Sequence, residues 1–437
     1  MLISFAVENY LSIKDRVELS MQAMPDRAND DKELAKNYQT FSLSEKEDKK
    51  YNILKSVLIY GLNASGKTNI LYAIQQFANF VVTSFERGNQ QISVVPFKLS
   101  SGTCEAPTTF EVVILLNGTY YRYGFSATKN YIFKEWLFSS TKGRESRIIY
   151  RERQENSDNY SFYNSKFRSL HKQVRENSLL LTVANLNNVP MAKEIIAFFE
   201  KVNLRPNGSR ILPREENRGL LGKIMQHLDI GVQDIQYTKK EVTNKDIEKL
   251  FSENPMLRNI HDSDSSEIKD RIRKDLSEIE DVSFSYIDDN GKEVYLSERL
   301  QSTGTLNIFS LISDLINSYK ENSIIIIDEI EESLHPLLLQ YFFKLFHAIP
   351  NNKVQLICTT YNVSLMSRGF RRDQIHITEK DDSLATTLVS IDDFTGISKK
   401  TPKQILEMYL DGRFGGVPAL SDLDIMNFVQ ALHEKEG

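Results

Sequence analysis

The chain has 437 residues, of which 41% are hydrophobic and 26% are charged, and its formal net charge is −5. These values are ordinary for a soluble protein of two or three domain-sized units, and they exclude a polycation built to coat nucleic acid. The two cysteines, Cys104 and Cys358, are far apart in the sequence, which argues against a disulfide framework or a zinc site. The longest aliphatic runs are too short to cross a bilayer, so we expect a cytoplasmic protein without a membrane partner.

The first 140 residues predict one lobe that is rich in β-strands. Residues 1–20 alternate like two strands joined by a turn, and the polar segment 25–50 predicts a flexible insertion. An apolar run over 108–116 is followed by Asn117-Gly118 and a second run over 119–125. Asn-Gly between two such runs is typical of a tight β-hairpin.

A phosphate-binding motif follows the apolar stretch Val57–Tyr60. The segment Gly61-Leu-Asn-Ala-Ser-Gly-Lys-Thr68 matches the P-loop pattern G-x-x-x-x-G-K-[ST], and a helix-like run follows it. Backbone N–H groups of such a loop wrap the phosphates of ATP, Lys67 reaches the β- and γ-phosphates, and Thr68 holds Mg²⁺. The predicted nucleotide-binding residues here are Gly61, Asn63, Ala64, Ser65, Gly66, Lys67, Thr68 and Asn69.

Residues 141–290 predict a separate, mainly helical insertion with a basic beginning. Residues 142–175 contain nine Lys or Arg and four acids, a local net charge of +5, with interleaved tyrosines and phenylalanines. This composition allows nucleic-acid binding, although a solvated hairpin and helix face would have the same composition. Further along, Ile268, Ile272, Leu276 and Ile279 recur at helical spacing.

Residues 291–437 return to alternating strands and helices, which predicts a mostly parallel sheet. The aliphatic run Ile324–Ile327 ends in Asp328 and Glu329, the pattern of a Walker B strand. Asp328 is expected to hold Mg²⁺ together with Thr68, and Glu329 is expected to activate the attacking water. Another buried strand is predicted over 353–360.

The order of several motifs resembles one family of ATPases. The shared segments are Phe5–Ser12, Pro96–Leu99, Ser302–Thr305, Asp328–Pro336, Arg372–Ile375 and Tyr409–Pro418. In this order the chain is similar to ABC-type ATPases of the abortive-infection AbiL / RloA-like group, which are related to RecF, Rad50 and the overcoming-lysogenization-defect ATPases. The resemblance implies an α/β fold, namely an ABC-type P-loop ATPase head with an antiparallel β subdomain and a helical insertion.

The resemblance also implies partners. Ser302 and Gly304 fall in the segment that resembles the ABC signature, which completes the ATP site of a second copy, so a homodimer or higher homo-oligomer around sandwiched ATP is expected. The group implies an ATPase subunit of an anti-phage system that controls a separately encoded nuclease or toxin. His335, in the segment resembling the D-loop, is either a helix cap or a catalytic residue.

The chain departs from the family at one position. A histidine usually follows the Thr-Thr pair after the strand next to Walker B, whereas Tyr361 follows Thr359-Thr360 here. A phenol donates a hydrogen bond but carries no positive charge near neutral pH, so slow or partner-stimulated turnover is expected. Two alternatives stay open: a DNA-repair ATPase that binds DNA through basic residues such as Arg151 and Arg153, and an ATP-stabilised scaffold that sequesters a toxin.

Overall fold

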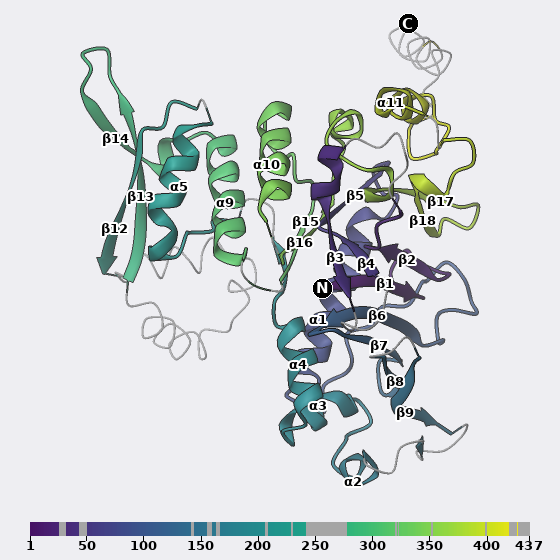
Figure 1. Ribbon diagram of the computed structural model, residues 1–437. Helices are drawn as coiled ribbons and strands as arrows, with labels where there is room; N and C mark the ends of the chain where they lie inside the picture. The colour runs from purple at the N-terminus through teal and green to yellow at the C-terminus, as the bar shows by residue number, and fades with distance from the viewer. Residues whose placement is uncertain are drawn as a thin grey trace, which may run out of the picture. The chain divides into compact units, whose positions relative to one another are not determined.

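The computed structural model describes residues 1–25, 32–42, 50–140, 144–154, 160–162, 167–205, 209–228, 230–241, 278–319, 321, 323–350, 353–397, 400–418 and 426. The contacts divide the chain into two compact units. The first combines Met1–Ser209 with Ser318–Gly437, and the second is Arg210–Asn317 (Figure 1). Each unit is described by itself below.

A six-stranded sheet in the first unit carries the nucleotide-binding motif. Its strand order is β11 (Val202–Arg205), β15 (Ile324–Ile327), β16 (Gln355–Thr359), β5 (Ser56–Gly61), β17 (Ile375–Lys380) and β18 (Thr386–Ser390). The first five are parallel and β18 is antiparallel. Every residue of β5, β15 and β16 is buried, as expected where helices or sheets cover both faces. The predicted mostly parallel sheet is confirmed.

A seven-stranded antiparallel sheet forms the other layer of the first unit. Its order is β10 (Tyr160–Phe162), β9 (Ser146–Arg153), β8 (Ile132–Ser140), β7 (Thr119–Ala127), β6 (Thr108–Leu116), β1 (Leu2–Glu8) and β2 (Val17–Ser20). Leu116 pairs with Thr119 across Asn117-Gly118, so the predicted hairpin is confirmed. Both residues of the turn have positive φ, 46° and 76°, as the tight turn requires.

Helix α1 (Lys67–Thr83) begins at the P-loop and packs into the main core of the first unit. The ring of Phe77 lies between 5.2 and 6.2 Å, centroid to centroid, from five other aromatic rings, those of Phe5, Phe110, Tyr123, Phe125 and Phe199. Four of these rings belong to the antiparallel sheet: one lies on β1, one on β6 and two on β7. The fifth lies on helix α4 (Pro190–Phe199). The helix that carries Lys67 and Thr68 is therefore held by aromatic packing around Phe77.

Further elements complete the first unit (Figure 1). They are η1 (Lys32–Asn37), β3 (Tyr38–Ser42), β4 (Lys50–Leu54), α2 (Arg168–His171), α3 (Leu180–Leu186), α10 (Pro336–Ala348), η5 (Val363–Ser367), η6 (Arg372–Gln374), η7 (Ile391–Asp393) and α11 (Pro402–Leu410). The hairpin β3–β4 differs from the flexible insertion expected over 25–50. Residues 26–31 and 43–49 of that insertion lie outside the described residues.

The second unit combines helices with an antiparallel sheet. It contains η3 (Glu215–Asn217), α5 (Arg218–Gln226), β12 (Asp234–Glu241), β13 (Glu278–Ile287), β14 (Glu293–Ser297), η4 (Glu298–Leu300) and α9 (Thr303–Ser318). We expected helices and a boundary at residue 141. Val282 and Phe284 instead alternate as buried residues of a strand. Ile268, Ile272 and Leu276 lie outside the described residues, and Ile279 belongs to β13.

The basic segment 142–175 does not present all of its charges to solvent. Arg151, which the alternative of a DNA-repair ATPase would use to bind DNA, is completely buried on β9, and its Nε donates to Glu135 at 2.8 Å. Arg153 stacks on the ring of Tyr131 at 3.8 Å. The DNA-repair alternative therefore loses Arg151 as a surface contact, because strand alternation turns this side chain toward a buried carboxylate. Lys166, another basic residue of the segment 142–175 that the DNA-repair alternative would use, lies outside the described residues.

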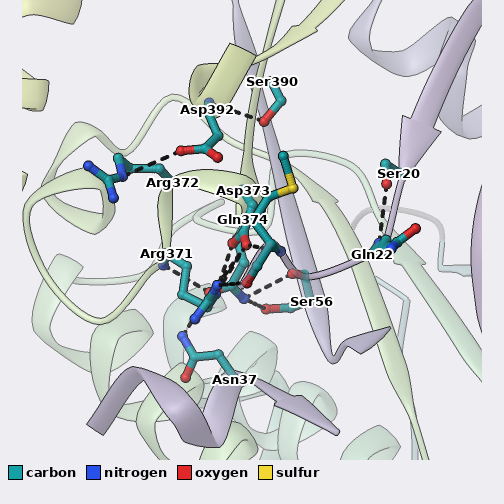
Figure 2. Close-up of polar contacts among 11 residues, drawn as sticks. Ser20, Gln22, Asn37, Ser56, Arg371, Arg372, Asp373, Gln374, Ser390 and Asp392 are labelled. Carbon is teal, nitrogen blue, oxygen red and sulfur yellow. Dashed lines mark hydrogen bonds and ion pairs between the residues drawn. The ribbon is translucent and has the colours of Figure 1, made fainter. Parts of the chain in front are cut away.

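A network of polar contacts fastens distant segments to the amino end of β5, opposite its P-loop end. Figure 2 shows Gln374, whose Nε2 donates to the carbonyl and the hydroxyl of Ser56 at 2.9 and 3.0 Å. Its Oε1 accepts from Asn37 at 2.7 Å. Arg371 pairs with Asp373 at 2.9 Å. The segment Arg372–Ile375 noted in the sequence is therefore structural and lies away from the phosphate-binding loop.

We predict that Phe77→Ala lowers the free energy of unfolding by about 3–5 kcal/mol, because it removes a buried ring with five aromatic neighbours. Urea denaturation followed by circular dichroism measures the change. Tyr72→Ala on the same helix is the matched control, since Tyr72 is 48% exposed, and it is expected to change stability by less than about 1 kcal/mol. Equal losses in the two variants would contradict the assignment of Phe77 to the core.

Candidate nucleotide-binding site

The P-loop turns sharply at three positions between β5 and α1. Gly61, Ala64 and Gly66 have φ angles of 147°, 63° and 104°, values that residues with a side chain rarely adopt. Glycine adopts such values without strain, which suits the first and third of these positions. Asn63 and Ala64 are exposed at the tip of the loop. The loop leads directly into the first turn of α1, where backbone N–H groups have no partner within the helix. This arrangement suits a bound phosphate group.

Lys67 is folded back over the loop. Its Nζ donates to the carbonyls of Gly61 and Leu62 at 2.9 and 3.0 Å, and to the hydroxyl of Tyr361 at 2.9 Å. The ammonium also lies 4.0 Å from the centroid of the Tyr361 ring. Burial lowers the pKa of Lys67, while the nearby carboxylates, Asp328 first among them, oppose that shift.

Thr68 and Asp328 meet although 260 positions separate them in the chain. The Thr68 hydroxyl donates to Asp328 Oδ2 at 2.8 Å, and the hydroxyl of Thr359, at the end of the neighbouring strand β16, donates to Asp328 Oδ1. The two predicted Mg²⁺ ligands are thus side by side at the carboxyl ends of parallel strands, where ligands bind in such sheets. The sequence pattern marks Thr359 only as part of the Thr-Thr pair and predicts no contact with Asp328; its position at the end of the strand beside Walker B is the signal that identifies this role.

Glu329 follows Asp328 in a left-handed conformation with φ 47°. Its backbone N–H donates to the Thr359 hydroxyl at 2.7 Å, which fixes this turn, and its side chain is exposed beside the loop. Partial burial, followed by the charges of Asp328 and Glu331, raises the pKa of Glu329. A carboxylate with a raised pKa is a better proton acceptor than an ordinary one, which suits a general base.

Glu331 joins the site although the sequence did not single it out. One of its carboxylate oxygens accepts the backbone N–H of Tyr361, and the other is buried without a hydrogen-bond partner in the described structure. Its charge also raises the pKa of Tyr361, after burial and the charges of Glu329 and Asp328. Tyr361, which is 41% exposed, therefore has its backbone fixed and its phenol ring beside solvent.

Hydroxyl groups on β17 and β18, and on the turn between β1 and β2, support the P-loop. Ser65 Oγ lies 2.6 Å from Thr378 Oγ1 on β17. Thr386 on β18 donates to the Ser65 carbonyl at 2.8 Å and lies 2.7 Å from the hydroxyl of Ser12. Ser12 in turn accepts from Asn69 Nδ2 at 2.6 Å. A hydroxyl has one hydrogen to donate, and that of Thr386 goes to the Ser65 carbonyl, so Ser12 is the donor in its contact with Thr386. The hydrogen bonds therefore run in one direction, from Asn69 through Ser12 and Thr386 to the carbonyl of Ser65.

The carboxy-terminal glycine segment touches the start of the P-loop. Tyr409 on α11 packs its ring against Tyr60, the residue before Gly61, with a centroid separation of 5.8 Å. The Tyr409 hydroxyl donates to the Gly416 carbonyl at 3.1 Å. A Cβ built on Gly416 would lie 3.3 Å from the Cα of Gly61. This close approach explains why glycine suits position 416.

Two further predicted residues, Ser302 and Gly304, lie in the second unit. Ser302 precedes α9 and accepts the backbone N–H of Thr305 at 3.1 Å, so it caps this helix, and Gly304 lies in its first turn. In the first unit, His335 caps α10 by accepting the Leu337 N–H at Nδ1, 3.2 Å away. The capping interpretation of His335 agrees with this contact.

Comparison with known proteins identifies the family. The sequence profile described as "AAA domain, putative AbiEii toxin, Type IV TA system" matches residues 56–367, which include the P-loop, Asp328 and Glu329. The chain belongs to this family of AAA-domain proteins. No curated protein matches the chain.

Solved structures of SMC heads are similar to the chain at low identity. One, "Crystal structure of the SmcHead bound to the C-winged helix domain of ScpA", is 13% identical with a TM-score of 0.40, and the match covers 89% of this chain and 97% of that one. The SMC head domain from Thermotoga maritima is 13% identical with a TM-score of 0.35, over 89% and 98% of the two chains. Among the described residues no helix has the length and apolar character needed to cross a membrane.

We predict that Gly66→Ala weakens binding of ATP by more than about tenfold and lowers stability by roughly 1–3 kcal/mol. A Cβ at this position would lie 2.0 Å from Thr386 Oγ1 at a φ of 104°. Isothermal titration calorimetry and thermal unfolding measure the two effects. Gly88→Ala is the control, because Gly88 also has positive φ (59°) but has nothing within 4 Å. ATP binding by Gly66→Ala at the wild-type affinity would contradict this geometry.

Proposed function

We propose that the protein binds and hydrolyses ATP as an ABC-type ATPase. The observation that carries this proposal is the hydrogen bond of 2.8 Å between Thr68 and Asp328, which joins the P-loop to the Walker B strand. A hydroxyl and a carboxylate that converge beside a phosphate-binding loop are the oxygen ligands that Mg²⁺ prefers. Membership of the AAA-domain family supports the same activity.

In this proposal each residue of the site has one task. Backbone N–H groups of Gly61–Thr68 and the ammonium of Lys67 bind the phosphates, and Thr68 and Asp328 hold Mg²⁺. The ion, when bound, neutralises charge that develops on the phosphate oxygens. Glu329 accepts a proton from the water whose oxygen attacks the γ-phosphorus, while the bond to the ADP oxygen breaks. Because its pKa is raised, Glu329 becomes protonated, and turnover is lost, at a higher pH than for an ordinary glutamate.

We further propose that two copies enclose ATP. Ser302 and Gly304 would complete the site of a second copy, which the resemblance to the ABC signature implies. The exposed Ser302 at the start of the 16-residue helix α9 supports this role, since the amino end of a helix favours an anionic ligand. ATP-dependent association would then depend on groups from both units of the chain.

We propose that this ATPase regulates a separately encoded effector in an anti-phage system of the abortive-infection type. The AbiL / RloA-like order of motifs supports this role, as does the family description, which refers to a toxin–antitoxin system. Among the alternatives, a DNA-binding repair ATPase loses one of its expected contacts because Arg151 is buried. The contact of Tyr361 with Lys67 favours the other, an ATP-stabilised scaffold with negligible turnover.

We predict that Glu329→Gln abolishes ATP turnover and traps an ATP-bound dimer, because the amide cannot accept the proton of water while phosphate binding is retained. Release of phosphate measures turnover, and mass photometry with and without ATP measures assembly. Glu332→Gln, a substitution at an exposed glutamate three residues further along, is the matched control and is expected to keep turnover. Turnover by Glu329→Gln at the wild-type rate would rule out Glu329 as the general base, and absence of turnover in the wild type would favour the scaffold.

A further inference from the structure

Every N–H group of the Lys67 ammonium already has an acceptor within the chain. The acceptors are the carbonyls of Gly61 and Leu62 and the hydroxyl of Tyr361, all at 2.9–3.0 Å. An ammonium has three hydrogens to donate. A phosphate oxygen that receives a hydrogen bond from Lys67 therefore has to replace one of these three partners.

The two carbonyl partners are the least able to move. Thr378 Oγ1 donates to the carbonyl of Tyr60 at 3.0 Å, immediately before the loop. A Cβ built on Gly61 would lie only 2.2 Å from the same Thr378 oxygen, so the backbone here packs tightly against β17. The carbonyl of Leu62 also accepts the Ser65 N–H at 3.2 Å. Both carbonyls are therefore held by contacts of the loop itself.

The phenol of Tyr361 is the partner that is free to leave. Its backbone is fixed on both sides: the Tyr361 N–H donates to Glu331, and the carbonyl of Asn362 accepts from the Tyr60 hydroxyl at 3.0 Å. Its side chain is 41% exposed, so the ring has open space to rotate into without disturbing the strand end. Displacement therefore requires only a change of the side-chain rotamer.

We propose that Tyr361 is a displaceable latch on Lys67 that makes the site discriminate between nucleoside triphosphate and diphosphate. With ATP, a γ-phosphate oxygen takes the third N–H of Lys67 by removing the phenol, and the freed ammonium then reaches the β-phosphate as well. With ADP, the N–H groups of the loop bind the β-phosphate while the phenol stays in place. The latch thus weakens the binding of ATP more than the binding of ADP. Until a triphosphate binds, the phenol of Tyr361 accepts the third N–H of the Lys67 ammonium. This proposal rests on the proposed nucleotide-binding function.

The hydroxyl and the ring of Tyr361 make separable contributions to the latch. The centroid of the Tyr361 ring lies 4.0 Å from the Lys67 ammonium, a cation–π contact that phenylalanine would preserve. Tyr361→Phe removes the hydrogen-bonding oxygen and little else, because the backbone is held independently. A hydrogen bond to a charged group that is partly exposed corresponds to a change of about tenfold in affinity.

Binding of two nucleotides to the full chain tests the latch. The probes are ADP and an ATP analogue with a non-hydrolysable β,γ-imido bond, each titrated calorimetrically with Mg²⁺ into wild type, Tyr361→Phe and Tyr341→Phe. Tyr341 lies on α10, is also 41% exposed, and is the matched control. We expect Tyr361→Phe to bind the triphosphate analogue about tenfold more tightly and ADP less than about threefold more tightly. Tyr341→Phe should match the wild type with both nucleotides.

The outcomes separate this inference from the proposed function. If Tyr361→Phe binds the analogue no more tightly than the wild type, or more weakly, the latch is wrong, and weaker binding would make Tyr361 a direct ligand of the phosphate. If both nucleotides gain equally, discrimination by Tyr361 is wrong. If the wild type binds neither nucleotide, the proposed function fails as well.

Discussion

The contact between Thr68 and Asp328 is the constraint on which the rest of the site depends. It joins the first turn of α1 to the end of β15, two elements that are remote in sequence, and Thr359 holds the second oxygen of the same carboxylate. Without this contact, the P-loop would bind phosphate, but the carboxylate of Asp328 would not lie beside it as a metal ligand. The fold keeps the contact in place by burying β5, β15 and β16 completely and by enclosing Phe77 among aromatic rings.

Both sides of this contact are supported by groups that never touch a phosphate. The side chains of Thr378 and Thr386 pack so closely against the P-loop that they fit only because Gly61 and Gly66 have no Cβ. On the other side, Glu331 fixes the backbone of Tyr361. Tyr361 therefore combines a fixed backbone with an exposed side chain beside a tightly packed loop. In such a site, the presence or absence of a γ-phosphate on the bound nucleotide would determine which rotamer of Tyr361 is favoured. A ligand that favours one rotamer over another shifts the population of conformations.

The sequence predicted the parts of the site that local patterns define. The P-loop, the Walker B strand and the Asn-Gly hairpin each have a strict local pattern, and the structure contains the hairpin and brings Thr68 to Asp328 as expected. Residues that act through tertiary contacts gave no such signal. Thr378, Thr386 and Glu331 are ordinary in their local sequence, and only the pairing of β17 with β5 and the turn after β15 bring them to the loop. The basic composition around Arg151 was misleading, because composition does not reveal which face of a strand is buried.

A double-mutant cycle on Thr68 and Asp328 tests the central contact most directly. Thr68→Val, Asp328→Asn and the double variant change chemistry with little change of volume, and the dependence of ATP-analogue affinity on Mg²⁺ concentration is measured for each. We expect each single variant to lose at least about tenfold of the Mg²⁺-dependent affinity, and the double variant to lose no more than the worse single one, since both groups serve one ion. Losses that multiply, or a Mg²⁺ dependence unchanged in either single variant, would contradict a shared metal site.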